Sequence, residues 1–409
     1  MTRDAESAAA EAVREHYSRV LAALAAQFRD VAAAEDALSD SLVAALAQWP
    51  KAGVPDNPAA WLLTVARRRL IDARRRQTLH DAMLKAIAQK IPEDPEMEED
   101  KRLQLLFACA HPAIEENVRA PLMLQVVFGL EASKIAGLFL MSPAAMAQRL
   151  VRAKQKIRDA AIPFHLPSPE EYPERLGFVL MAIYALFAAG YNAGRGAMAE
   201  NRDTPIFDAL WLGQLVVGLS NREPEALGLL SLMLFVQSRS GARRDTGGRY
   251  VPLSEQSTDL WDRDAIRRAN ALLNEAAALV APGRFQIEAA IQSVHAARAE
   301  SGTTDWAAIL AFYDALLDFA PTPVAVINRA LAVLHVHGAD AALAEIAFLE
   351  DDKRVVDYQP YWAARAHLLA KAGRRGDADR AYARAIALEN DSAAREFLET
   401  ERARVARPG

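Results

Sequence analysis

The sequence has little cysteine and few long apolar runs, and each shortage excludes a class of protein. The 409-residue chain contains one cysteine, Cys109, which excludes a disulfide framework and a cysteine-based zinc site. Because Cys109 lies in an apolar run between Phe107 and His111, we expect a small buried side chain. No apolar run approaches the roughly 20 residues that span a bilayer, and the polar start MTRDAESAAA is unlike a signal peptide. We therefore expect a cytoplasmic protein without a membrane partner.

The chain also lacks the residue patterns of an enzyme active site. It shows no metal-binding cluster, no nucleophile paired with a base and no phosphate loop, and its eight histidines are scattered. Tyr184, Tyr191 and His295 are only loose candidates for catalysis. We expect a protein that is not an enzyme, with no catalytic residue, no metal and no cofactor.

Composition predicts an all-α protein with two or three domains. Alanine-rich runs, few β-branched clusters and proline or glycine between helical periods are all typical of helices. The net charge is −5, but residues 1–162 hold 22 Lys+Arg against 21 Asp+Glu, whereas the remainder holds 26 against 32. The first part is thus nearly neutral, and its cations are gathered into runs that can still bind a polyanion.

Residues 131–160 have the pattern of a helix-turn-helix. Ser142 suits an N-cap and Pro143 a first helical position. Five cations and no acid then lie between Arg149 and Arg158, which favours DNA binding, although such a face can also be merely solvated. Steps of four, three and four residues form one apolar stripe, which consists of Met146, Leu150, Ala153 and Ile157. Opposite it lie Gln148, Arg152, Gln155 and Lys156, and it is flanked by Arg149, Lys154 and Arg158.

The first 80 residues combine an acidic helix with a very basic one. Helices are expected at 11–27 and at about 31–49, and Asp36 and Asp40 lie on the face of the second that is opposite its core. This acidic face either is solvated or docks a basic partner. The core stripe is predicted to consist of Val31, Leu38, Leu42, Leu46 and Trp49.

A further helix is expected from Asn57 as cap and Pro58 as first residue. Its apolar start, around Trp61, should be buried. Residues 67–76 then hold six arginines interrupted by one acid, Asp72. Because this density is too high for a salt-bridged helix face, a polyanion partner is favoured.

The acidic segment IPEDPEMEED, residues 91–100, is typical of a linker. After residue 160 four prolines lead into helix after helix, and one pattern near the C-terminus has the spacing of a tetratricopeptide repeat. Weaker units precede it at Tyr313 to Pro321 and at 324–350. Such arrays usually bind peptides or other domains. The pattern consists of Trp362, Leu369, Gly373, Ala378, Tyr382 and Ala385.

Two basic helical modules joined by an acidic linker resemble the extracytoplasmic-function sigma factors of bacterial RNA polymerase. AEDALSDSLVAAL resembles region 2 where it docks on the polymerase clamp, and DNPAAWLLTVARRRLID resembles the part that opens and recognises the −10 element. MAQRLVRAKQKIRDA resembles region 4, whose recognition helix binds the −35 element. The remainder, including MAIYALFAAGY, looks like the C-terminal extension of the group with tetratricopeptide-like repeats.

The resemblance implies a role for each matching residue. It places Asp36, Ser39 and Asp40 at the clamp contact. Along the opened promoter strand it places Arg67, Arg68 and Arg69. In the −35 major groove it places Gln148, Arg149 and Arg152, with Lys154 and Lys156 nearer phosphates. The implied partners are core RNA polymerase, through its clamp and flap, promoter DNA, and a regulatory protein or ligand on the repeats.

Four positions depart from the family pattern. Arg68 stands where the family commonly has Asn, and Ala145 replaces a frequent Thr. Ala188 and Ala189 stand where the extension usually has Asn-Glu. The resemblance predicts four parts, namely region 2 at 1–80, a linker at 81–101, region 4 at 102–162, and a regulatory helical domain at 163–409.

Two other functions fit part of the sequence. A one-component helix-turn-helix repressor with a C-terminal sensor explains residues 131–160 but gives no role to the arginine run. A repeat scaffold without a DNA role explains neither basic segment.

Overall fold

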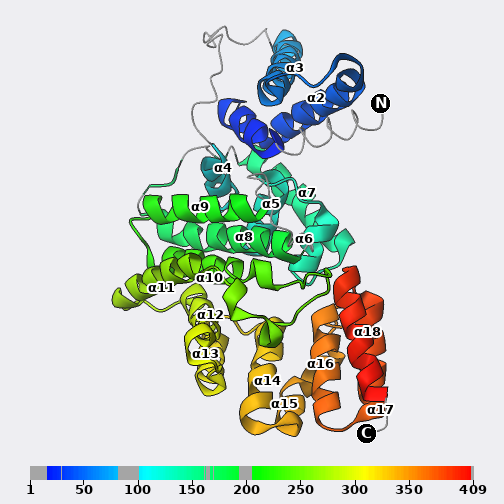
Figure 1. Ribbon diagram of the computed structural model, residues 1–409. Helices are drawn as coiled ribbons and strands as arrows, with labels where there is room; N and C mark the ends of the chain where they lie inside the picture. The colour runs from blue at the N-terminus through cyan, green and yellow to red at the C-terminus, as the bar shows by residue number, and fades with distance from the viewer. Residues whose placement is uncertain are drawn as a thin grey trace. The chain divides into compact units, whose positions relative to one another are not determined.

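The computed structural model describes residues 16–28, 30–81, 101–160, 162, 166–168, 170–192 and 205–406 (Figure 1). Regular structure within these ranges is helical, which confirms the all-α prediction. The chain divides into two compact units, Met1–Ala185 and Leu186–Gly409, and the boundary falls inside helix α8. The predicted acidic linker at 91–100 lies outside the described residues.

The described part of the first unit begins with helical residues 16–28. Helix α2 follows and packs against α3. Helices α4 to α7 then pack together, with α7 in contact with α5, α6 and α2. The bounds are α2 (Val31–Ala52), α3 (Pro58–Asp81), α4 (Arg102–Cys109), α5 (Glu116–Val126), α6 (Ala132–Leu138), α7 (Pro143–Asp159) and α8 (Tyr172–Asn192).

Capping residues define both ends of α2 and the start of α3. The carboxylate of Asp30 accepts a hydrogen bond from Ala33 N at 3.0 Å, and the side chain of Asn57 accepts one from Ala60 N at 3.0 Å. Gly53 ends α2 with a φ of +86°, a conformation in which a side chain would be strained. The predicted cap at Asn57 and start at Pro58 are confirmed.

The buried line of α2 differs from the predicted stripe at one position. Val31, Leu38 and Trp49 are buried and Leu42 is half-buried, but Leu46 is 46% exposed, so its prediction as a core residue is wrong. The buried line instead passes through small residues, which let α2 approach its neighbours closely, and Leu46 lies at its edge. These small residues are Ala34, Ala37, Ser41 and Ala45.

Helices α6 and α7 form the predicted helix-turn-helix. The hydroxyl of Ser142 accepts a hydrogen bond from Ala145 N at 3.3 Å, and Pro143 is the first residue of α7. Leu140 turns the chain with a φ of +51°, and Met141 N donates to a carbonyl of α6. The predicted stripe is confirmed, since each member is at most 5% exposed. Its members are Met146, Leu150, Ala153 and Ile157.

The first half of α8 belongs to the core of the first unit. The rings of Phe107 and Tyr172 lie 4.7 Å apart, and the guanidinium carbon of Arg119 lies 4.5 Å from the ring centroid of Phe178. The unit therefore extends past residue 162, where the sequence patterns predict a domain end. Because they anchor α8 to α4 and α5, these aromatic contacts must be kept in any fragment that is to fold.

Helix α8 is also the longest apolar element of the described chain. Its stretch Tyr172–Tyr191 is long and apolar enough, by length and composition only, to cross a membrane. The expectation that no apolar run approaches this length is therefore wrong. Half of the stretch is buried inside the structure, and the core helix of a soluble protein has the same composition.

The second unit is a succession of packed helices (Figure 1). Ten consecutive residues of α10 are buried, because the helix is apolar on all sides and α9, α11 and α12 pack around it. The bounds are α9 (Pro205–Leu219), α10 (Pro224–Gln237), α11 (Arg263–Ala278), α12 (Arg284–Ser301), α13 (Trp306–Phe319), α14 (Pro323–His337), α15 (Ala339–Ile346), α16 (Gln359–Lys371), α17 (Arg375–Leu388) and α18 (Ser392–Ala406).

The predicted repeat pattern falls on a helix pair, α16 and α17. Gly373 joins them with a φ of +73°, and Gly338 precedes α15 with a φ of +89°. Leu369 and Tyr382 are buried in a common cluster that fills the space between the two helices. The helix pair agrees with the repeat spacing, and its tetratricopeptide nature remains a prediction.

A close crossing of α10 and α12 in the second unit yields a stability prediction. A Cβ at Gly228 of α10 would lie 2.7 Å from the backbone nitrogen of Gln286 of α12. We expect Gly228→Ala to lower the free energy of unfolding by about 1–3 kcal/mol, because the helices must separate. Gly218→Ala, on exposed α9 surface with no atom within 4 Å of the added Cβ, should raise it by about 0.5–1 kcal/mol. Equal effects in urea unfolding would contradict this packing argument.

Candidate polymerase and nucleic-acid interface

The residues predicted to contact the polymerase clamp share an exposed face of α2. Asp36, Ser39 and Asp40 are all exposed. Val43 lies beside them with 68% of its surface exposed, and Leu46 is 46% exposed. Asp36 forms no ion pair with any described residue. Acidic groups next to uncovered apolar side chains are suited to docking a partner that is basic and partly apolar.

The arginines of α3 begin directly beside this acidic face. Arg69 Nη1 lies 2.7 Å from the carboxylate of Asp40, and both side chains are largely exposed. An exposed pair of this kind contributes about 0–1 kcal/mol, so either member can exchange its partner readily. Arg68 is exposed and Arg67 half-buried. The side chains of Arg74, Arg75 and Arg76 lie outside the described residues.

The basic face of α7 is accessible along most of its length. Gln148, Arg152 and Lys156 are exposed at successive steps of four residues, which places them in one row, and Arg149 beside them is half-buried. The exposed side-chain donors at these positions can approach a major groove. The side chain of Arg158 lies outside the described residues.

Lys154 lies in a different environment from the other cations of α7. Its ammonium contacts both carboxylate oxygens of Glu35 on α2, each at 2.7 Å, and the side chains are only 19% and 21% exposed. Tyr17 is packed nearby, where burial and the charge of Glu35 raise the pKa of its hydroxyl. The Tyr17 ring would lie 3.1 Å from a Cβ at Gly129, so the ring would have to shift slightly to admit a side chain, and the φ of +65° at Gly129 would strain that residue.

Glu35 is a site residue that the sequence did not predict. Its partner Lys154 is 119 residues away, and no local pattern distinguishes Glu35 from the neighbouring acids of α2. The one available signal was its position next to Asp36, one residue off the acidic face.

Comparison with known proteins identifies the first of these modules. Residues 12–80, which contain the described α2 and α3, match Sigma-70 region 2. These residues are a Sigma-70 region 2 module, which supports a place for the chain in the sigma-70 family. Such a module points to transcription initiation, with core RNA polymerase and promoter DNA as the partners that it implies.

Two further comparisons extend beyond the Sigma-70 region 2 match. Residues 175–277 match a family of unknown function, DUF6596. The chain is 37% identical to the uncharacterized protein R00370 of Rhizobium meliloti (strain 1021) over 390 residues, 93% of this chain and 92% of the relative, and belongs to one family with it. No solved structure matches.

Two of the loose candidates for catalysis, His295 and Tyr191, pack against aromatic side chains. The His295 ring packs edge-on against Trp306, with centroids 5.6 Å apart, and burial followed by the charges of Arg239 and Arg298 lowers its pKa to about 4. Tyr191 stacks on Phe187. Cys109 is fully buried, as predicted, and burial raises the pKa of its thiol to about 12. Such a thiol is unreactive.

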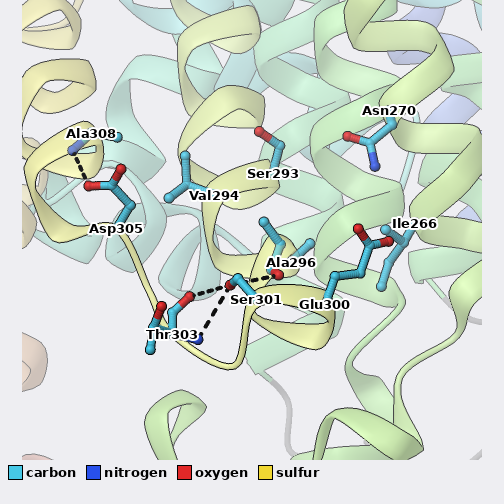
Figure 2. Close-up of a pocket in the computed structure, with 11 residues that line it drawn as sticks. Ile266, Asn270, Ser293, Val294, Ala296, Glu300, Ser301, Thr303, Asp305 and Ala308 are labelled. Carbon is cyan, nitrogen blue, oxygen red and sulfur yellow. Dashed lines mark hydrogen bonds between the residues drawn. The ribbon is translucent and has the colours of Figure 1, made fainter.

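A polar cavity of about 580 Å³ lies between α11, α12 and the start of α13 (Figure 2). Several polar groups on its wall already have partners. The Ser301 hydroxyl donates to the carbonyl of Thr303 at 2.8 Å, and the Asp305 carboxylate accepts from Ala308 N at 2.9 Å as the cap of α13. Because these groups stabilise the α12–α13 turn, we assign the cavity a structural origin.

The Glu35–Lys154 pair leads to a prediction for duplex binding. Glu35→Gln removes the counter-charge that holds Lys154, so the lysine becomes available to a phosphate. We expect tighter binding of any DNA duplex, and a plot of log affinity against log salt that is steeper by about one unit, the contribution of one phosphate contact. Fluorescence anisotropy across a salt series measures both quantities.

A matched control is Asp159→Asn, which removes an acid at the end of α7 that binds Gln155 instead of a cation. This control should change the affinity slightly and leave the salt slope as it is. An unchanged slope in Glu35→Gln would mean that Lys154 does not contact phosphate.

Proposed function

We propose that this protein is a sigma factor of the extracytoplasmic-function type that acts in the cytoplasm. The observation that carries the proposal is the exposed acidic and apolar face of α2, within a matched Sigma-70 region 2 and directly beside the arginines of α3. The acidic face of α2 can bind polymerase while the arginines of α3 bind DNA. A repressor that acts alone has no use for such a docking face.

In this function, Asp36, Ser39 and Asp40 bind the polymerase clamp. Docking brings α3 against the opened −10 element, where Arg67, Arg68 and Arg69 follow the backbone of the unpaired strand. Bases must leave the stack to be recognised, which costs a few kcal/mol. Cations along the backbone and stacking in a base pocket offset that cost.

The helix-turn-helix supplies the second promoter contact. We propose that it is region 4, held by the polymerase flap, with α7 in the −35 major groove. Its row of Gln148, Arg152 and Lys156 has the spacing with which a recognition helix contacts successive base pairs. Lys154 reaches a phosphate only after it leaves Glu35, so the contact between α2 and α7 opens when both modules bind DNA.

The second unit is proposed to regulate this activity as a tetratricopeptide-like domain. Its support is the series of helix pairs from α13 to α18, with glycines in left-handed conformation at Gly338 and Gly373. Packed helix pairs of this kind offer surfaces for a peptide or a protein domain.

Run-off transcription with purified core polymerase on a genomic promoter library tests the proposal. Discrete transcripts that depend on the added protein support it. The rival repressor function would instead be supported by specific duplex binding without polymerase and no initiation. Failure both to initiate and to bind any duplex, at low salt as well as high, would support the scaffold.

A further inference from the structure

A buried cluster of basic and aromatic side chains lies in the second unit, where α10 ends and α11 begins. Arg239 follows the last turn of α10 and is 5% exposed. Trp261 precedes α11 and is 3% exposed. The guanidinium carbons of Arg239 and of Arg298, from α12, lie 6.0 and 5.0 Å from the Trp261 ring. Two cations therefore face one buried indole.

The hydrogen bonds within this cluster are incomplete. Arg239 Nη2 donates to the side-chain oxygen of Gln292 at 2.5 Å, but Arg239 Nη1 is buried without a partner. Trp261 Nε1 is a second buried donor without a partner, and the side-chain oxygen of Gln256 is a buried acceptor without one. Buried polar groups are nearly always hydrogen-bonded, so this concentration requires an explanation.

The cluster also lacks negative charge. Arg298 donates to the backbone carbonyls of Ser254 and Gln256 at 2.8 and 2.9 Å, and neither acceptor is a carboxylate. Among the described residues, no Asp or Glu forms an ion pair with Arg239 or Arg298. Burial lowers the pKa of Arg239, the nearby Tyr191 raises it, and the charges of Arg298 and Arg243 lower it. A buried guanidinium without a counter-charge is strongly unfavourable.

We propose that Arg239, Arg298 and Trp261 form a binding site for a small oxyanion, a carboxylate or a phosphate. A guanidinium binds both groups through parallel N–H donors, and an oxyanion supplies the charge and the acceptors that the cluster lacks. Arg298 is half-buried, so it is more accessible than Arg239. Arg239 and Trp261 lie within the segment matched by the family of unknown function. The proposal does not depend on the sigma-factor function.

The cavity of Figure 2 is a different surface of the same helix. At about 100° per residue, Gln292, His295 and Arg298 share one face of α12, whereas Ser293 and Glu300 lie on the opposite face. The only charged groups on the cavity wall are acidic, Glu300 and Asp305, and they would repel an anion. We therefore place the oxyanion on the arginine side alone.

Isothermal titration calorimetry on the full chain in chloride buffer tests the site, with inorganic phosphate in one arm and acetate in the other. We expect wild type to bind at least one of them, and Arg239→Met to weaken it by at least tenfold. Trp261→Phe keeps the ring but loses the N–H, and should weaken binding several-fold. Arg267→Met removes an exposed arginine of α11 that pairs with Asp264, and should leave binding unchanged. The arm that binds more tightly distinguishes phosphate from carboxylate.

Thermal unfolding keeps the proposal testable if a variant folds poorly. Without oxyanion, Arg239→Met should unfold at the wild-type temperature or above it, because an uncompensated charge is removed. With saturating oxyanion, wild type should become the more stable of the two. The proposal is overturned if neither ion binds wild type at millimolar concentration, or if Arg239→Met binds equally well. The unpartnered donors would then be satisfied by water.

Discussion

Reversal of the acidic face of α2 is expected to lower transcription by about 100-fold or more. The double variant Asp36→Arg/Asp40→Arg places two positive charges against the basic partner surface that the acids are proposed to bind. Like charges that face each other across an interface cost several kcal/mol of binding free energy. Both side chains are exposed, so the fold should tolerate the change. Run-off transcription with core polymerase measures the loss, and pull-down of core enzyme measures the binding.

Two comparisons separate docking from its alternatives. Asp56→Arg changes an exposed acid in the loop before α3 and should retain nearly full activity. Asp40→Asn alone releases Arg69 without reversing the face, so a mild effect there assigns the loss to polymerase binding rather than to the Arg69 pair. Full activity of the double variant would show that α2 is not the docking helix.

The local features of this fold could be predicted because each depends on neighbouring residues. Ser142 and Pro143 fix the start of α7, Asn57 fixes that of α3, and the apolar stripe of α7 follows from a period of 3.6 residues. Leu46 was assigned wrongly because an apolar residue at the edge of a stripe is also what a docking face requires. Hydrophobicity alone does not distinguish these two positions.

The long-range pairings could not be predicted. Lys154 flanks the apolar stripe of α7 and is half-buried, whereas Lys156 lies opposite the stripe and is exposed, but no local pattern predicts that the partner of Lys154 is Glu35. Arg239, Trp261 and Arg298 come from three separate segments, and only the packing of α10, α11 and α12 brings them together. The clamp and DNA contacts assigned by resemblance remain predictions, which the transcription and duplex-binding experiments test.

Removal of two side chains from the recognition helix should abolish promoter selectivity. Gln148 and Arg152 are exposed one turn apart on α7, a spacing suited to base edges in one groove. A well-placed bidentate contact is worth about 1–3 kcal/mol. Gln148→Ala/Arg152→Ala should therefore cost about 2–6 kcal/mol on the preferred duplex and little on unrelated sequences.

Lys156→Ala is the matched comparison, because its exposed ammonium is proposed to contact phosphate. It should weaken binding to all duplexes alike and reduce the salt slope by about one unit. Anisotropy with a preferred and a scrambled −35 duplex measures both variants. If the double variant instead weakened both duplexes equally, Gln148 and Arg152 would be backbone contacts. Promoter choice by this protein would then depend on the −10 strand and the arginines of α3.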